Sequence, residues 1–400
     1  MKYITNPNII YILSFSLPLL VYGLQWSTIY PVLGFDLVIF YLVTFTICIV
    51  INLFLPYKAD KFTYHNIPLS KYNTKVLLSL YIFYLVDIIY SGYIPLIAFS
   101  SGDRDYGGSI EYGIPVLHVL VVTFNLFYAL YAFHQFISNR NKRILLIYFL
   151  LLLPFVILLQ RSNIMYIIIG SFFVYILSLK KISLKKLGYT FIAAVFSMYM
   201  FGYLGNLRSA NGDSTYIPMS SGVTDDFLKG PIPNEFYWSY LYIGSPLANL
   251  QNNLNQARDK YTDYTALVVY EYMPDFLSKR LSKELSLQPR AFEQINSFLN
   301  VGTIYSRPYN YAGWTGIIIT FIYFISLMNI YYTNICYSYT YSVTGFAMMF
   351  LAIALANFEN TIQFSAYSFQ LIYPLILSAI KKYKQSKSVM PIQQHESSFR

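Results

Sequence analysis

Ten long apolar runs, separated by short polar breaks, dominate the pattern of the chain. Each run approaches or exceeds the roughly 20 residues that an α-helix needs to cross the hydrocarbon core of a bilayer. The pattern therefore predicts an all-α polytopic membrane protein with about 10 transmembrane helices. The predicted spans are residues 9–26, 29–55, 76–99, 113–137, 144–159, 164–179, 187–205, 311–330, 339–357 and 364–380.

The composition supports a membrane protein and adds little chemistry of its own. Of the 400 residues, 56% are hydrophobic and 12% are charged, whereas a soluble domain carries about 25% charged residues. The first residues lack a basic region and a small-residue cleavage motif, so we expect a retained first helix rather than a signal peptide. Cys48 and Cys336 lie in or beside apolar runs, which indicates neither a disulfide framework nor a metal site.

The basic residues predict which side of the membrane each break faces. Of the 28 lysines and arginines, 17 fall on alternate breaks, and the positive-inside rule assigns those breaks to the cytoplasm, together with both termini. The opposite side carries 11 basic and 14 acidic residues. The net charge of +10 therefore reflects topology and does not indicate nucleic-acid binding. The cytoplasmic set is Lys2, Lys58, Lys61, Lys71, Lys75, Arg140, Lys142, Arg143, Lys180, Lys181, Lys185, Lys186, Lys381, Lys382, Lys384, Lys387 and Arg400.

One outer segment, residues 206–310, is far longer than the few residues of a typical connection. It contains FYWSYLYIGSPLANL and YTALVVYEYMPDFLSKRL, which are aromatic, amphipathic and long enough for helices in the membrane interface. We expect a structured lid or binding element. The predicted organisation is residues 1–205 with seven spans, the outer segment 206–310, residues 311–380 with three spans, and a basic cytoplasmic tail at 381–400.

Three arginines stand at predicted outer boundaries of the membrane. Arg161 lies in QRSN between the fifth and sixth spans, Arg208 ends the seventh span in FGYLGNLRSANGD, and Arg307 precedes the eighth in NVGTIYSRPYNYAGWTG. A guanidinium is a planar fork that suits phosphate oxygens and stays charged in any environment. Converging arginines would form a cradle for a diphosphate. The alternative is that each one reaches out to ordinary lipid phosphates.

Glycines, amides, hydroxyls and tyrosines surround these arginines and recur in the middle of the outer segment. Amides and hydroxyls bond sugar hydroxyls, and glycine permits close approach of the backbone. A compositional bias toward tyrosine and asparagine would give the same pattern without a sugar site. The predicted substrate-binding residues are Asn206, Ser245, Asn249, Thr303, Tyr305, Tyr309 and Asn310.

Residues able to move a proton are fewer. His118 lies near the outer end of the fourth span, and Glu359 lies at the outer end of the ninth, where it would act as a base or pair with an arginine. Asp36 and Asp87 are carboxylates within spans, and such residues are functional candidates by default. The alternative for His118 is a packed, hydrogen-bonded side chain.

No metal or cofactor motif stands out. Asp103 and Asp105 have the D-x-D spacing that chelates divalent ions, but so short a spacing is common by chance. The chain has no phosphate-binding G-x-x-x-x-G-K-[ST] loop, no H-E-x-x-H, no G-x-S-x-G and no C-x-x-C. We therefore predict no metal site and no cofactor.

Four motifs follow one another in a characteristic order. They are the R-S-N turn between two apolar runs, FGYLGNLRS at the end of a span, FYWSYLYIGSPLANL in the outer segment, and NVGTIYSRPYNYAGWTG before the next span. Over about residues 140–330 this order resembles the Wzy-type oligosaccharide repeat-unit polymerases of O-antigen and capsule synthesis. The number of predicted spans extends the resemblance to the whole chain.

The resemblance implies a GT-C-like membrane glycosyltransferase that needs no metal. Such enzymes use repeat units built on undecaprenyl diphosphate. Outside the bacterial inner membrane they move the growing glycan from its lipid onto the non-reducing end of a new unit. The implied partners are this lipid-linked oligosaccharide, membrane lipid and a chain-length regulator protein. Periplasmic arginines are the residues usually implicated, and they map onto Arg161, Arg208 and Arg307.

Two other functions remain alternatives. The related O-antigen ligases rely on a histidine in the large loop, and residues 206–310 contain none. A flippase or another transporter would be expected to show internal repeats and charge near mid-membrane. Here we find no repeat between the two halves of the chain, and the charge lies at the predicted outer end of the helix bundle. The polymerase is therefore the favoured interpretation.

Overall fold

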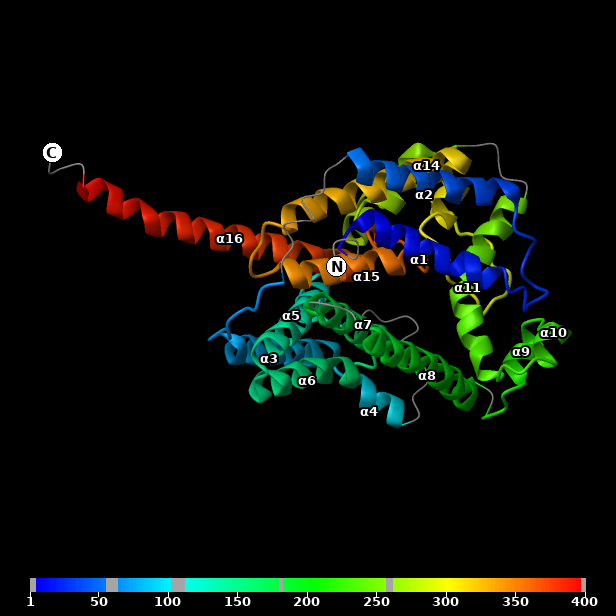
Figure 1. Ribbon diagram of the computed structural model, residues 1–400, viewed down its shortest axis with the longest axis horizontal. Coiled ribbons are helices and arrows are strands. Elements are labelled where there is room, and N and C mark those ends of the chain that lie inside the picture. Colours follow the sequence, from blue (N-terminus) through cyan, green and yellow to red (C-terminus); the bar gives the residue numbers. More distant parts are fainter. Residues whose placement is uncertain are drawn as a thin grey trace. The chain divides into compact units, whose positions relative to one another are not determined.

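The computed structural model describes residues 5–54, 64–101, 112–179, 183–209, 211–256 and 262–396 (Figure 1). Within these ranges the chain is helical, and the only extended pairing is an isolated antiparallel bridge between Ser27 and Val223. The prediction of an all-α protein is confirmed. The helices are α1 (Pro7–Tyr22), α2 (Phe35–Phe54), α3 (Asn73–Ser91), α4 (Pro95–Ser100), α5 (Leu117–Asn139), α6 (Lys142–Ile157), α7 (Arg161–Ser178), α8 (Leu184–Ser209), α9 (Tyr216–Ser220), α10 (Asp225–Leu228), α11 (Glu235–Asn255), α12 (Tyr264–Leu267), the π-helix η2 (Val268–Tyr272), α13 (Asp275–Glu284), α14 (Ser306–Ile335), α15 (Ser342–Leu355) and α16 (Ser365–Glu396).

Six of the described helices are long and apolar enough to cross a membrane, namely α2, α3, α5, α7, α8 and α14. Helices α1 and α15 are apolar but shorter. Large apolar side chains such as Phe191, Ile192 and Phe196 of α8 are more than 60% exposed, which is expected of a surface that faces lipid. A helix coincides with each of the ten predicted runs. A membrane protein is supported, while the count of ten spans and the GT-C-like arrangement stay predictions.

The predicted span 76–99 is interrupted. Helix α3 ends at Ser91 because Gly92 adopts a left-handed conformation with φ of 78°, and its N–H donates to the Ile88 carbonyl at 2.9 Å. Pro95 then occupies the first position of α4, where its missing N–H costs nothing. Helix α14 has a similar interruption at Ala312 and Gly313, so Arg307 lies on a short helical segment before the main span.

The outer segment 206–310 is structured, as expected, where the chain is described. FYWSYLYIGSPLANL lies within α11, but YTALVVYEYMPDFLSKRL does not form one helix. It divides into α12, η2 and α13, because Pro274 cannot continue the helix and the residue before a proline avoids the α conformation. The predicted division of the chain at residues 205, 310 and 380 stays a prediction.

The chain forms two compact units, each built from separate stretches of sequence. The first unit comprises Met1–Ala59, Lys180–Leu327 and Ile353–Gln363, and the second comprises Asp60–Leu179, Met328–Ala352 and Phe364–Arg400. In the first unit, α11 packs against α1 and α8, with Tyr237 and Tyr240 buried in an aromatic cluster. In the second, α5 is the central helix and packs against α3, α6, α7 and α16.

Candidate functional site

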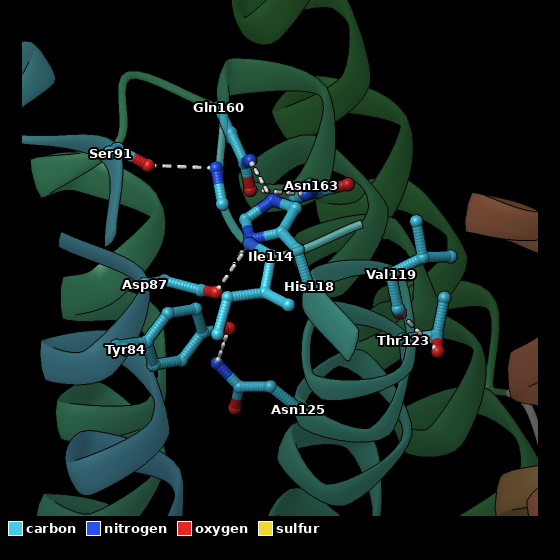
Figure 2. Close-up of polar contacts among 11 residues, drawn as sticks. Tyr84, Asp87, Ser91, Ile114, His118, Val119, Thr123, Asn125, Gln160 and Asn163 are labelled. Atoms are coloured by element: carbon cyan, nitrogen blue, oxygen red, sulfur yellow. Dashed lines mark hydrogen bonds and ion pairs between the residues drawn. The ribbon is translucent and has the colours of Figure 1, made fainter. Parts of the chain in front are cut away.

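A histidine, a carboxylate and an amide from three helices meet in the second unit (Figure 2). His118 lies in the first turn of α5, Asp87 in the last two turns of α3, and Gln160 immediately before α7. His118 Nδ1 is 2.8 Å from Asp87 Oδ2, and His118 Nε2 is 3.3 Å from Gln160 Nε2. The structure thus joins two candidates that the sequence offered separately.

The hydrogen bonds of this cluster fix the tautomer of the imidazole. Gln160 Oε1 accepts from Asn163 Nδ2 at 2.9 Å, so the Gln160 NH₂ group faces His118 and donates to Nε2. His118 Nδ1–H then donates to Asp87, whose other oxygen accepts the Ile114 N–H at 3.0 Å. The lone pair of Nε2 consequently points away from the carboxylate. This is the orientation that a carboxylate imposes on a histidine acting as an acceptor of protons.

The loop before α5 packs closely against the imidazole of His118. Gly113 has a φ of 82°, and a Cβ built on it would lie 2.7 Å from the His118 ring. Its N–H donates to Ser91 Oγ at 2.8 Å, which ties the loop to the end of α3. Asp87 is 1% exposed and the His118 side chain 14% exposed. The cluster is therefore rigid, with the ring rather than the carboxylate open to its surroundings.

Arg161 follows Gln160 of this cluster in the sequence. It is the first residue of α7, it is exposed, and it forms no ion pair with the described residues. The turn before it is strained in one place, because Leu159 has a φ of 55°. Arg161 is thus exposed, and no carboxylate within the described residues pairs with it.

The first unit holds a second cluster, in which one arginine faces two carboxylates. Arg307 Nη2 is 3.6 Å from Glu359 Oε2, and the two side chains are 32% and 31% exposed. The other oxygen of Glu359 accepts the Asn360 N–H at 3.1 Å. Of the two roles predicted for Glu359, the structure shows the pairing with arginine.

Glu271 lies behind this pair and was not among the predicted residues. It is 2% exposed, and the Asn360 side chain donates to its carbonyl at 2.7 Å and to its Oε2 at 3.2 Å. Burial raises the pKa of Glu271 to about 8, against the opposing effects of Arg307 and Asn360. Burial likewise raises the pKa of Glu359, against the effect of Arg307. Both glutamates lie outside the six candidate spans.

The sequence carried one signal for Glu271. It is the only acidic residue in YTALVVYEYM, a run of apolar and aromatic residues, and it falls in a π-helix. Such helical irregularities are frequent at functional sites. A charged residue alone in an apolar run needs a partner when it is buried, and Asn360 and Arg307 are those partners.

The three predicted arginines are divided between the units. Arg161 belongs to the second unit, and Arg208 and Arg307 belong to the first. Arg208 lies in the last turn of α8, is exposed and forms no ion pair with the described residues. A common diphosphate cradle of all three arginines stays a prediction.

Most of the predicted sugar-binding residues have structural partners. Asn249 is fully buried; its side chain accepts from the Ile295 N–H at 2.8 Å and donates to the carbonyls of Leu299 and Val301, each at 2.7 Å. These bonds hold the loop before α14 against α11. Contacts with sugar therefore stay a prediction for this set. Asn206 accepts from Trp238 Nε1, Asn310 donates to the Ala291 carbonyl, Tyr305 pairs with Tyr11, Thr303 lies beside Ser306, and Ser245 and Tyr309 are buried.

Asp103 and Asp105, the D-x-D pair, lie outside the described residues. No protein-family model, no curated protein and no solved structure matches this chain. The functional argument consequently depends on the two clusters themselves.

Proposed function

We propose that this protein polymerises oligosaccharide repeat units linked to undecaprenyl diphosphate, for O-antigen or capsular polysaccharide, on the outer face of the bacterial inner membrane. The observation that carries the proposal is the Arg307–Glu359 pair, which is partly exposed and lies next to the buried Glu271. Arg307 is the second residue of α14, a candidate membrane span. A carboxylate and a guanidinium side by side are the two groups that glycosyl transfer from a diphosphate requires.

Each residue of the pair has one task in the proposed reaction. Glu359 takes the proton from the acceptor hydroxyl, and the acceptor oxygen attacks the anomeric carbon of the growing glycan. The bond between that carbon and the diphosphate oxygen breaks, and its electron pair leaves with undecaprenyl diphosphate. Arg307 stabilises the charge that develops on the diphosphate. The raised pKa of Glu359 increases its affinity for this proton.

Glu271 keeps the cluster receptive to an anion. Below its pKa of about 8 it is largely protonated, so the charge of Arg307 is shared with Glu359 alone. If Glu271 were ionised, two carboxylates would surround the one guanidinium and would repel a diphosphate. Asn360 fixes the distance between the two glutamates, because its backbone N–H holds Glu359 and its side chain holds Glu271.

The test uses a gene deletion and a single substitution, with surface polysaccharide separated on a gel. We expect the deletion to leave products of one repeat unit. Loss of a flippase would instead leave no product, and loss of a ligase would leave polymer on its lipid carrier; either pattern contradicts the proposal. Glu359→Gln should behave as the deletion does at normal protein level. The matched control is Glu293→Gln, an exposed glutamate of the same unit, which should restore full-length polymer.

A further inference from the structure

Helix α14 begins with a short separate segment, residues 306–311, which carries Arg307. The backbone leaves the helical conformation directly after this segment, at Ala312 and at Gly313, where φ is 60°. The break interrupts the hydrogen bonds that the next turn would make to the last carbonyls of the segment, so other donors must satisfy them. The direction in which Arg307 points toward Glu359 depends on what holds this segment.

Arg290 reaches the end of the segment from the loop before α14. Its Nη1 donates to the Asn310 carbonyl at 2.8 Å, and its backbone N–H donates to the Tyr311 hydroxyl at 2.9 Å. The Asn310 side chain returns a hydrogen bond to the Ala291 carbonyl at 2.7 Å. The Tyr311 carbonyl accepts the Asp263 N–H at 3.0 Å. An arginine that bonds the last carbonyls of a helix is a recognised way of ending it.

The loop that carries Arg290 is itself fixed to α11. Asn253 of α11 is buried; its side chain donates to the Glu293 carbonyl at 2.8 Å and accepts the Glu293 N–H at 2.9 Å. Asn249, one turn earlier on α11, accepts the Ile295 N–H at 2.8 Å. Since α11 packs against α1 and α8, Arg290 is attached through this loop to the core of the first unit.

Tyr311 connects the same contacts to Glu271. Its ring stacks on the Tyr270 ring, with centroids 6.0 Å apart and 10° between the planes. Tyr270 immediately precedes Glu271 in η2. The Arg290 guanidinium carbon lies 5.9 Å from the centre of the Tyr311 ring, within the range of a cation–π contact. The start of α14 and the π-helix, which carry Arg307 and Glu271, are thus held together at Tyr311.

We propose that Arg290 is a positioning residue: its hydrogen bond to the Asn310 carbonyl holds the start of α14 so that Arg307 faces Glu359 and Glu271. Arg307 lies less than one turn before that carbonyl, so a small rotation of the short segment would move its guanidinium away from both carboxyl groups. The importance of this position for glycan transfer rests on the proposed function, whereas the positioning itself does not. Arg290 was not among the predicted site residues.

The influence of Arg307 on Glu271 provides a measurement that needs no glycan transfer. Burial raises the pKa of Glu271 to about 8, and Arg307 opposes this rise. The stability that the protonated carboxyl contributes is therefore complete at low pH and is lost as the pH rises to about 8. If Arg290→Ala lets Arg307 move away, the pKa should rise further and the loss should extend about one pH unit higher. Melting temperatures of the full-length protein in detergent, from pH 5 to pH 10, show where the loss ends.

Three comparisons isolate the positioning effect. Arg280→Ala removes the same charge at an exposed site of the same unit and should not move this upper limit. Arg290→Ala should shift nothing in a Glu271→Gln background, which lacks the carboxyl, and should add nothing to Arg307→Ala, which already lacks the guanidinium. The other ionisable side chains that act on Glu271, unchanged in every variant, are Glu359, Tyr272 and Tyr311.

Two results would overturn the proposal. One is an unchanged upper limit in a folded Arg290 variant, and the other is the same shift from Arg290→Ala when Arg307 is already absent. If the alanine variant does not melt cooperatively, Arg290→Lys takes its place. It keeps the charge but lacks the planar fork, so it should move the limit in the same direction by a smaller amount.

Surface polysaccharide separates this inference from the proposed function. Arg290→Ala should lose most chain extension at normal protein level, because misplacing a reacting group by ~1 Å can cost roughly 10² in rate. A shifted upper limit together with full-length polymer would support the positioning by Arg290 and contradict the part of Arg307 in transfer. Loss of polymer with an unchanged limit would overturn the positioning role.

Discussion

The two polar clusters each contain a buried carboxyl group, Asp87 in one and Glu271 in the other, but they differ in how that group is stabilised. Asp87 has a full set of partners, with His118 at 2.8 Å and the Ile114 N–H at 3.0 Å, so its geometry is fixed. Glu271 shares the Arg307 guanidinium with Glu359, and the side-chain hydrogen bond that it accepts from Asn360 is long, at 3.2 Å. Asp87 is held by two hydrogen bonds, whereas burial raises the pKa of Glu271, which favours its protonated form.

This difference suggests that the two clusters have different roles. A carboxyl group whose hydrogen bonds are all satisfied positions its neighbours, whereas one whose pKa is raised by burial is a candidate for proton transfer. We therefore assign positioning to the Asp87 cluster and proton transfer to the Glu271–Arg307–Glu359 cluster. The following predictions test that division, beginning with the largest expected effect.

The largest effect should come from Arg307. Removing a preorganised donor from developing negative charge typically costs roughly 10²–10³ in rate, so Arg307→Ala should abolish chain extension in a gel of surface polysaccharide. Arg307→Lys should restore little, because a lysine offers a point charge in place of a fork. Arg280→Ala, at an exposed site of the same unit, is the control. Full-length polymer from Arg307→Lys at normal protein level would remove Arg307 from the reaction.

Glu271 should make stability depend on pH. Its pKa is about 8 in the folded protein against 4.5 for the free side chain. Between these values the folded state binds more protons than the unfolded state, so stability should fall as the pH rises, by up to ~5 kcal/mol in total. Arg307 and Glu359 face this group, so they also influence how steeply stability changes with pH.

The matched variant is Glu271→Gln, which replaces a largely protonated carboxyl with a neutral amide. Melting temperatures measured from pH 5 to pH 9 should fall for the parent protein. The variant should lack the part of this fall that Glu271 contributes. A parent protein whose stability rises through this window would show that Glu271 is ionised when folded.

The same isosteric change should have the opposite result in the other cluster. Asp87→Asn leaves one accepting oxygen, where His118 and Ile114 now contact two. Leaving a buried donor or acceptor unsatisfied costs ~1–3 kcal/mol, so the melting temperature should drop at pH 7, where Glu271→Gln should leave it nearly unchanged. If both amide variants behave alike, the two clusters do not differ as proposed.

The sequence predicted the helices well because membrane length and apolar composition are local properties. It identified His118 and Asp87 as separate candidates, but their contact spans 31 residues and depends on the register of α3 against α5. Glu271 was missed for the same reason, since its partner Asn360 is 89 residues away. The breaks at Gly92 and Gly313 were also missed. A glycine in an apolar run is tolerated in a membrane helix, and only its backbone conformation shows that the helix stops.

The smallest expected effect comes from alanine substitutions at Gly113 and Gly92, which distinguish backbone strain from packing against His118. Gly113 and Gly92 have similar φ values of 82° and 78°, so alanine should cost about 1 kcal/mol at either position from the backbone alone. At Gly92 nothing lies within 4 Å of an added Cβ, whereas at Gly113 the His118 ring lies at 2.7 Å. Since Asp87 and Gln160 hold that ring, it cannot move without losing a hydrogen bond. Gly113→Ala should therefore lower the melting temperature more than Gly92→Ala. Equal effects of the two substitutions would mean that the ring yields, and that the Asp87 cluster is less rigid than its hydrogen bonds indicate.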